Sequence, residues 1–231
     1  MKAVILAAGK GVRLQPLTND RPKQMVEVLG RPIIDYVLEL LPEEITEIIM
    51  IVGYKREVLE SHLGDSRQGR KITYVIQEEL KGPYAAICLA KPYLGEESFM
   101  VIFADDLYDK ASIKKLLLHS RTMLVHEVSE PSRFGIVVLN GDGTIKDIEE
   151  KPANPKSSLA VTGAYVFDSH LFEYEPETHS NGEFYLPPVI MKMKEKYPVY
   201  TEKAEFWMPI GYPEDIAKAE EALRAGRING T

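Results

Sequence analysis

A glycine-rich turn followed by two cations, close to the start of the chain, is the first candidate for chemistry. Gly9 and Gly11 come directly after the apolar run 3–8, and the fixed positive charges of Arg13 and Lys23 follow soon after. Glycines after a strand let backbone N–H groups approach a ligand closely and surround a phosphate. A triphosphate leaves water only when several donors replace its hydration, so this pattern predicts a nucleotide site.

Two better-known glycine motifs do not fit this turn. A dinucleotide-binding fingerprint needs G-x-G-x-x-G, but Leu14 stands at the third glycine position. A P-loop needs Gly-Lys followed by Ser or Thr, but Val12 follows Gly11. A dinucleotide oxidoreductase is therefore disfavoured, and a purely structural turn remains the alternative for the glycines taken alone.

The turn belongs to a longer pattern that continues for fifteen positions or so along the chain. Its members are Gly9, Gly11, Arg13, Leu14, Pro16, Thr18, Pro22 and Lys23. This pattern resembles the signature of the sugar-1-phosphate nucleotidyltransferases, and Lys23-Gln24 is similar to their glucose-1-phosphate thymidylyltransferase branch. The resemblance implies that Ala8, Gly9, Gly11 and Arg13 bind a nucleoside triphosphate. It also implies that Arg13 and Lys23 are catalytic, with Lys23 on the α-phosphate.

Gln77 and Gly82 are the candidates for recognition of the base. In the family that the signature resembles, a Gln and a Gly at this spacing contact a pyrimidine. A glutamine amide has both a donor and an acceptor, which match the imide edge of such a base. Without the resemblance, an ordinary polar residue at a strand end and a turn glycine would be the better interpretation. The sequence does not separate dTTP from UTP, since their bases differ by one methyl group.

Asp105 follows the apolar run 99–104 and is the candidate metal ligand. The resemblance implies that it holds Mg²⁺, with Asp106 as a second candidate ligand. A carboxylate at a strand end that faces a triphosphate suits a hard cation. As an alternative, either aspartate could cap a helix that begins near Ser112.

Motifs in the second half of the chain resemble the part of the family that binds the sugar phosphate. The glycine of Glu130–Gly135 would bring its backbone close to the sugar. Glu150 would accept hydrogen bonds from sugar hydroxyls, and Lys151 would be catalytic by binding the phosphate of the sugar-1-phosphate. Val161 and Thr162 would line the sugar pocket. Taken alone, Lys151 would be interpreted as a solvated surface lysine.

Several positions depart from the family pattern, among them Val12, Glu27, Ala104 and Pro209. Pro209 stands where relatives carry a second metal-binding aspartate, and a proline side chain cannot ligate a metal. The resemblance implies a Mg²⁺-dependent nucleotidyltransferase that joins a nucleoside triphosphate, dTTP or UTP, to a sugar-1-phosphate and releases pyrophosphate. The alternative is a catalytically impaired paralogue that binds nucleotide sugars as a regulatory or sensor subunit. Arg13, Lys23 and Lys151 together favour the enzyme.

The elements that must position these residues follow from the hydrophobic pattern. The apolar runs 3–8, 48–53, 72–77 and 99–104 predict buried strands, and helices are predicted between them over 32–41, 57–63 and 83–90. This alternation predicts an α/β fold with a Rossmann-like, doubly wound, mostly parallel mixed sheet. Gly9, Gln77 and Asp105 all fall at the carboxyl ends of strands, where such sheets bind ligands.

After Leu116 the chain changes character. Short strands are predicted over 123–127, 135–139, 145–150 and 164–167, as mixed or antiparallel additions that form the acceptor side of the cleft. Helices are predicted over 186–196 and 213–227. We expect a single domain over 1–231, in which 1–116 binds the nucleotide. Residues 117–231 would then supply the sugar-phosphate subregion and the C-terminal helix.

Composition limits the partners. With 231 residues, 45% of them hydrophobic, the chain can fill a sizeable core, and its net charge of −7 gives no general basic surface for nucleic acid or an anionic membrane. No apolar run approaches the roughly 18 residues of a membrane span. Cys88, in an apolar run, is the sole cysteine of the sequence and predicts a buried, inert thiol. A single cysteine excludes a disulfide framework within the chain, which fits a reducing compartment, and we expect the cytoplasm. A homo-oligomer is compatible with the sequence, which does not define it.

Overall fold

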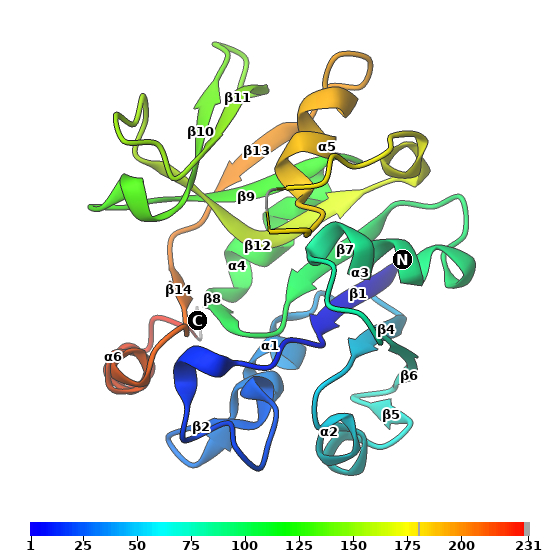
Figure 1. Cartoon of the computed structure of the whole chain (residues 1–231), viewed down its shortest axis with the longest axis vertical. Helices are drawn as coiled ribbons and strands as arrows, with labels where there is room; N and C mark the ends of the chain where they lie inside the picture. Colours follow the sequence, from blue (N-terminus) through cyan, green and yellow to red (C-terminus); the bar gives the residue numbers. More distant parts are fainter. Residues whose placement is uncertain (180, 229–231) are drawn as a thin grey trace.

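The computed structural model describes residues 1–179 and 181–228, and a sheet of ten strands runs through it (Figure 1). The middle of this sheet is parallel, in the order β7-β1-β4-β6. These strands are β1 (Lys2–Ala7), β4 (Glu47–Val52), β6 (Arg70–Ile76) and β7 (Phe99–Phe103). The apolar runs located all of them to within two residues, because strands covered on both faces are largely apolar. The largest difference is in β6, which begins with the polar pair Arg70-Lys71.

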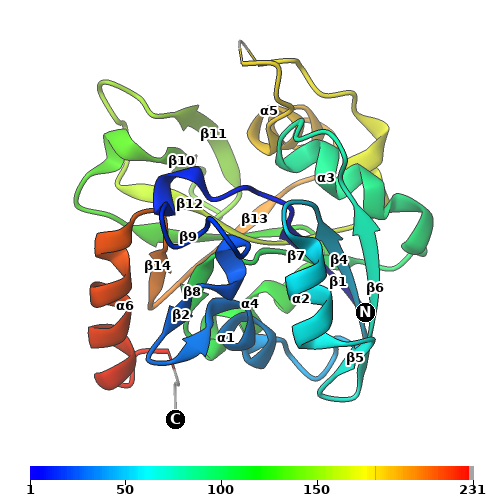
Figure 2. The same ribbon diagram turned by 60° about the horizontal axis from the view of Figure 1, so that its bottom comes forward.

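Helices cover both faces of the parallel strands, so the doubly wound arrangement is confirmed (Figure 2). In β1, Ala3 and Ile5 join one core layer and Val4 joins the other, since side chains alternate across a strand. The first layer is covered by α1 (Ile33–Leu40), α2 (Arg56–Leu63), α4 (Lys110–Lys115) and α6 (Pro213–Arg224). The second is covered by α3 (Pro83–Ala90) and α5 (Leu186–Met193).

The second half of the chain extends the same sheet with mainly antiparallel strands, as the sequence predicted. Its longest strand, β12 (Leu159–Phe167), pairs with β7 on one side and begins earlier than the predicted run 164–167. The pairing of β12 with β9 shifts register between Val161 and Tyr165. This irregularity interrupts the alternation of apolar and polar residues by which a strand is located in a sequence. The other strands here are β9 (Thr122–Glu127), β10 (Gly135–Leu139), β11 (Ile145–Glu150) and β13 (Tyr200–Lys203).

Short elements complete the fold and carry several candidate residues. Strands β2 (Glu27–Val28) and β3 (Arg31–Pro32) form a small pair, and β5 (Ser66–Arg67) pairs with β6. A second small pair joins β8 (Asp106–Tyr108) to β14 (Trp207–Pro209). The 3₁₀ turns are η1 (Val12–Leu14), η2 (Lys23–Met25), η3 (Lys91–Tyr93), η4 (Leu116–Leu118), η5 (Pro131–Arg133) and η6 (Ser169–Glu173).

The start of α4 decides whether Asp105 or Asp106 caps a helix, the alternative that the sequence left open. Asp109 caps this helix, because its carboxylate accepts a hydrogen bond of 2.8 Å from the backbone N–H of Ser112. Neither Asp105 nor Asp106 is the cap, so the helix-cap interpretation of these two residues is wrong. The last two helices of the chain, α5 and α6, are shorter than predicted. Each ends three residues before the predicted position, at Met193 and Arg224.

The structure can be compared with two expectations drawn from composition, one about membrane spans and one about Cys88. Across residues 1–179 and 181–228, no helix combines the length and hydrophobicity that crossing a membrane requires. Cys88 is a free thiol on α3 that is partly exposed rather than fully buried as predicted, and its partial burial raises its pKa. A raised pKa leaves less of the nucleophilic thiolate, in keeping with the inert cysteine that the sequence predicted.

Candidate active site

A cavity of about 490 Å³ lies at the carboxyl ends of β1, β6 and β7. It brings together the residues that the sequence assigned to the nucleotide and the metal: Ala8, Gly9, Gly11, Arg13, Lys23, Gln77, Gly82 and Asp105. These residues come from five separate segments, and parallel strands deliver them to one edge of the sheet. We call this space the first cavity.

Lys23 and Asp105 form an ion pair in the wall of the first cavity. Lys23 lies on η2 and Asp105 follows β7, and the ammonium Nζ is 2.5 Å from Oδ2 of the carboxylate. The backbone N–H of Ala104 donates to the carbonyl oxygen of Leu6, which keeps the end of β7 alongside β1. Because Lys23 is mostly buried, its ammonium needs such a partner in the free protein. The other oxygen of Asp105 has no hydrogen-bond partner among the described residues.

The glycines of this cavity allow close backbone approach. Gly11 has φ +61°, and a Cβ atom there would lie 3.0 Å from Cβ of Lys23. Gly82 has φ +87°, and a Cβ atom there would lie 2.8 Å from the carbonyl oxygen of Phe184. Any larger residue would therefore strain the backbone and displace a neighbouring segment.

Two further cations line the first cavity, and only Arg13 was predicted from the sequence. Arg13 lies on η1 and donates from Nη1 to the phenol oxygen of Tyr212, at 3.3 Å. Lys10 lies between the two glycines, is exposed, and has no ion pair in the part of the chain that the structure describes. A lysine inside a phosphate-binding turn was a signal that could have identified Lys10.

Two glutamines face the first cavity. Gln77 is buried at the end of β6, and none of the described residues hydrogen-bonds its amide, so donor and acceptor are both available to a ligand. Gln24, next to Lys23, was assigned no role from the sequence. It is also buried, and its Oε1 has no hydrogen-bond partner within residues 1–179 and 181–228. An unsatisfied buried acceptor is rare in native structures, and in a cavity wall it marks a place where a ligand can donate.

A second cavity of about 290 Å³ adjoins the first, and the two share Pro83 and Phe103 in their walls. It is lined by the residues that the sequence assigned to the sugar, apart from Lys151: Gly135, Glu150, Val161 and Thr162. The pairing of β10 with β11 sets Gly135 opposite Glu150. The hydroxyl of Thr162 donates to the carbonyl oxygen of Leu124, at 2.8 Å, so this side chain is fixed in the wall.

Asp106 lines the second cavity, whereas Asp105 lines the first. Its Oδ2 accepts hydrogen bonds from Nε1 of Trp207, at 2.9 Å, and from the hydroxyl of Tyr108, at 3.2 Å. Burial, and then the neighbouring Asp105 carboxylate, raise the pKa of Asp106 to about 7. One oxygen of Asp106 is thus engaged, and its role as a second metal ligand stays a prediction.

Pro209 lies directly beside these two aspartates. It is opposite Asp106 in the pair of β14 with β8, and the next residue, Ile210, donates its backbone N–H to the carbonyl oxygen of Asp105 at 3.1 Å. The proline therefore lies beside the candidate metal ligand Asp105 without offering a side-chain ligand itself. Among the described residues, no group of three or more His, Cys, Asp or Glu side chains is arranged to hold a metal ion.

Lys151 is the one catalytic candidate that the structure leaves outside both cavities. Its side chain is exposed, its backbone has φ +42°, and Nζ lies 3.5 Å from Oε1 of Glu150. This placement is that of the solvated surface lysine considered as the alternative. A role in binding the acceptor phosphate stays a prediction.

Comparison with known proteins adds independent evidence. A family model described as nucleotidyl transferase matches residues 2–226. A protein of Haloferax volcanii, named UTP–glucose-1-phosphate uridylyltransferase AglF, is 35% identical over 244 residues and covers 100% of both chains. The bifunctional protein GlmU of Methanocaldococcus jannaschii is 35% identical over 226 residues. That match covers 96% of this chain but 54% of GlmU, so the chain spans about half the length of that relative.

The fold is shared with a solved structure. It is that of a putative glucose-1-phosphate thymidylyltransferase from Bacillus anthracis, in complex with sucrose. The TM-score is 0.86 at 28% sequence identity, over 97% of this chain and 95% of the other. The predicted α/β class is confirmed by this likeness, and the resemblance seen in the sequence motifs is confirmed by the family match. The chain therefore belongs to the nucleotidyl transferase family.

Proposed function

We propose that the protein transfers a nucleotidyl group from dTTP or UTP to a sugar-1-phosphate and releases pyrophosphate. The observation that carries this proposal is the pair of adjoining cavities that share Pro83 and Phe103. The first is lined by three cations, by Asp105, and by two glutamine side chains that have no hydrogen bond among the described residues, and the second by carboxyl groups beside small and aromatic residues. A reaction between two phosphorylated molecules needs neighbouring sites of this kind, which hold the reacting atoms in line. The supply of nucleoside triphosphates favours the cytoplasm as the compartment.

The first cavity would hold the nucleoside triphosphate. Arg13 would bind the β- and γ-phosphates that leave as pyrophosphate, and Lys23 would bind the α-phosphate. The free amide of Gln77, beside Gly82, would donate to a carbonyl oxygen of the pyrimidine and accept from its imide N–H. The charge-assisted bonds from Arg13 and Lys23 are the strong contacts in this arrangement.

The second cavity would hold the sugar-1-phosphate. Glu150 would accept hydrogen bonds from sugar hydroxyls, while Gly135, Val161 and Thr162 form the surrounding wall. Lys151 would turn from Glu150 toward the acceptor phosphate. An exposed ion pair contributes little free energy, about 1 kcal/mol at most, so this exchange of partners is inexpensive.

In the chemical step, an oxygen of the acceptor phosphate attacks the α-phosphorus. A new P–O bond forms there, and the bond to the bridging oxygen of the β-phosphate breaks, with its electron pair leaving on pyrophosphate. The nucleophile is already an anion, so no covalent enzyme intermediate is required. Lys23 and Arg13 would offset the repulsion between the two anions and stabilise the charge that develops around phosphorus.

Asp105 would hold Mg²⁺ through the oxygen that has no partner among residues 1–179 and 181–228. Mg²⁺ commonly binds one or two carboxylates together with phosphate oxygens and waters, so a single aspartate is compatible with binding despite Pro209. When bound, the ion would supply Lewis-acid stabilisation of phosphate charge. Lys23 would at the same time exchange Asp105 for the α-phosphate.

A crossed screen tests this proposal. Several nucleoside triphosphates are combined with several hexose-1-phosphates, and pyrophosphate release is followed with Mg²⁺ and with a chelator. We expect release with a pyrimidine nucleotide, and its loss on chelation. Absence of release in every combination, with nucleotide binding retained in calorimetry, would contradict the enzyme and favour the sensor subunit.

A further inference from the structure

Arg13 differs from the other cation of the first cavity that the sequence predicted. Lys23 is neutralised by Asp105 in the free protein, whereas Arg13 has no carboxylate partner within the described residues. The guanidinium of Arg13 instead contacts Tyr212 in two ways. Nη1 donates to the phenol oxygen at 3.3 Å, and Cζ lies 5.0 Å from the centre of the ring.

Tyr212 is held in place independently of Arg13. It precedes Pro213 at the start of α6, and Oδ2 of Asp215 accepts hydrogen bonds of 2.9 Å from the backbone N–H groups of Gly211 and Tyr212. On its other side, the backbone of Ile210 is bonded to Asp105. The segment that carries Tyr212 is therefore anchored both to α6 and to the wall of the first cavity.

A neutral aromatic partner has a physical consequence that a carboxylate would not have. The ring face and the hydroxyl restrict the guanidinium through cation–π attraction and one hydrogen bond, but they leave its positive charge uncancelled. A long exposed side chain that is already oriented loses less conformational entropy when it binds a phosphate. No carboxylate then has to be displaced before the ligand can bind.

We propose that Tyr212 is a positioning residue that holds Arg13 toward the phosphates of the nucleotide. The inference rests on the proposed function, because it assumes that the first cavity receives a triphosphate. It predicts that Tyr212 affects the triphosphate and pyrophosphate and leaves the sugar-1-phosphate unaffected.

The test is a double-mutant cycle with Tyr212→Leu, Tyr212→Phe and Arg13→Ala, read by calorimetric titration of UTP and dTTP in the presence of Mg²⁺. We expect Tyr212→Leu to weaken triphosphate binding about three- to fivefold, the size of an exposed cation–π contact, and Tyr212→Phe to weaken it less because the ring remains. In the Arg13→Ala background neither change should weaken binding further. In turnover assays, KM for the sugar-1-phosphate should change less than that for the triphosphate.

Tyr93→Leu is the matched control, since Tyr93 has no contact with Arg13 and has 43% exposure against 37% for Tyr212. It should bind triphosphate like the unmodified chain. The inference is overturned if Tyr212→Leu binds normally, or if its loss is the same with Arg13 already removed. Should Tyr212→Leu fail to fold, Tyr212→Phe in both backgrounds decides the question.

The same data separate this inference from the proposed function. Triphosphate binding that depends on Tyr212 through Arg13, without turnover for any substrate pair, would reject the proposed function and support the role of Tyr212. Turnover without that dependence would support the function and reject the role. No triphosphate binding by the unmodified chain would reject both.

Discussion

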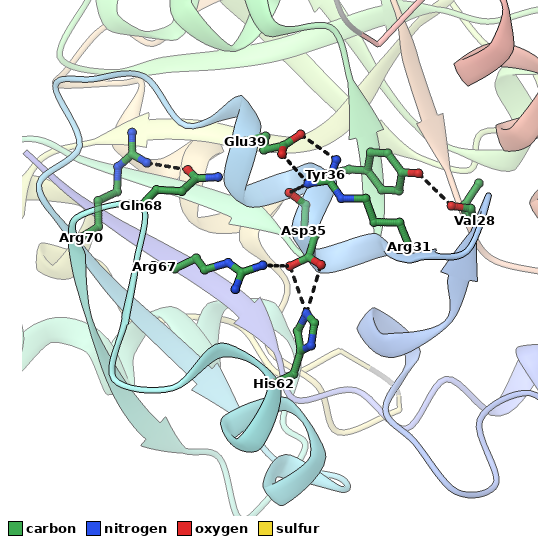
Figure 3. Close-up of polar contacts among 9 residues, drawn as sticks. All are labelled: Val28, Arg31, Asp35, Tyr36, Glu39, His62, Arg67, Gln68 and Arg70. Carbon is green, nitrogen blue, oxygen red and sulfur yellow. Dashed lines mark hydrogen bonds and ion pairs between the residues drawn. The ribbon is translucent and has the colours of Figure 1, made fainter.

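Asp105 and Asp35 are both carboxylates that face cations from distant parts of the chain, but their surroundings differ. Asp35 lies on α1, with 7% of its side chain exposed. Nε2 of His62, on α2, is 3.1 Å from both of its oxygens, and Nη2 of Arg67, on β5, donates to Oδ1 at 3.2 Å (Figure 3). We call these three residues the Asp35 cluster. Both carboxylate oxygens of Asp35 therefore have partners, and we call the cluster closed in this sense.

The pair of Asp105 with Lys23 is open by comparison. Asp105 has 28% exposure, one of its oxygens has no partner among the described residues, and both side chains line a cavity. The ammonium of Lys23 has three N–H donors, and one of them is on Asp105. A buried ion pair alone therefore does not mark a functional site. Unfilled bonding capacity beside a cavity is what separates the two regions.

The Asp35 cluster has a structural role that reaches the active site. It ties α1 to α2 and to the hairpin of β5 with β6. The same α1 packs against η2, which carries Lys23, and against β8, which begins at Asp106. The closed cluster thus supports the scaffold on which the open pair is placed.

The largest expected effect comes from breaking the open pair. Lys23→Ala and Asp105→Asn should each lower kcat by about a hundredfold or more, because Lys23 would contact the reacting phosphates directly and Asp105 would do so through Mg²⁺. One such charge-assisted contact stabilises the transition state by about 3 kcal/mol. Asp105→Asn should also lower the free energy of unfolding, because it leaves the mostly buried ammonium of Lys23 without its partner. Lys23→Ala should change stability less, because the more exposed Asp105 can be hydrated from the cavity. Steady-state pyrophosphate release and urea unfolding measure the two quantities.

Lys203→Ala is the control for this first prediction. Lys203 pairs with Glu127 at 2.6 Å on the exposed edge formed by β13 and β9, away from both cavities. Its removal should leave turnover unchanged. Near-normal rates for Lys23→Ala or Asp105→Asn would remove these residues from the proposed mechanism.

Disrupting the Asp35 cluster should instead lower the stability of the protein and leave its turnover close to normal. Replacing both His62 and Arg67 by leucine leaves the Asp35 carboxylate buried without a charged partner. We expect the free energy of unfolding to fall by about 3 kcal/mol, as when one side of a buried ion pair is removed. Turnover per folded molecule should stay close to normal, because neither residue lines the two cavities. Urea unfolding gives the first quantity, and activity at low temperature gives the second.

A compensating change sharpens this test. Adding Asp35→Leu to the double variant removes the unpaired charge, so most of the lost stability should return. If the double variant is as stable as the unmodified chain, or if Asp35→Leu restores nothing, the buried charge is not what the cluster neutralises.

The fold was predictable where strands bury both faces and where helices begin with clear signals. The bounds of α3 were predicted to the residue, with Pro83 at its first position. Strands β8, β13 and β14 were not predicted, because three or four residues carry no periodicity of their own. Their pairing depends on neighbours such as Tyr108 and Trp207, which are distant in sequence but opposed in the structure.

The candidate site was predictable wherever its residues belong to local motifs. The turn from Gly9 to Arg13 is one such motif, and its positions can be compared with a family pattern directly. The Asp35 cluster has no local pattern, because Asp35 is 27 positions from His62 and 32 from Arg67. Lys151 belongs to a local motif, but its side chain lies outside both cavities. A motif identifies a residue without giving the direction in which its side chain points.

The smallest expected effect is at the edge of the Asp35 cluster. Arg31 and Glu39 are 2.5 Å apart, closer than any contact of Asp35, but their side chains have 36% and 46% exposure (Figure 3). Water and salt screen such a pair, and Arg31 has a second contact, since its Cζ lies 4.7 Å from the centre of the ring of Tyr36. Glu39→Gln should therefore lower the free energy of unfolding by about 0.5 kcal/mol or less. That difference should vanish in about 0.5 M salt, where the screening length is only a few ångströms. A loss above about 1 kcal/mol that persists in salt would mean that short distance, rather than closure from water, sets the strength of the ion pairs in this cluster.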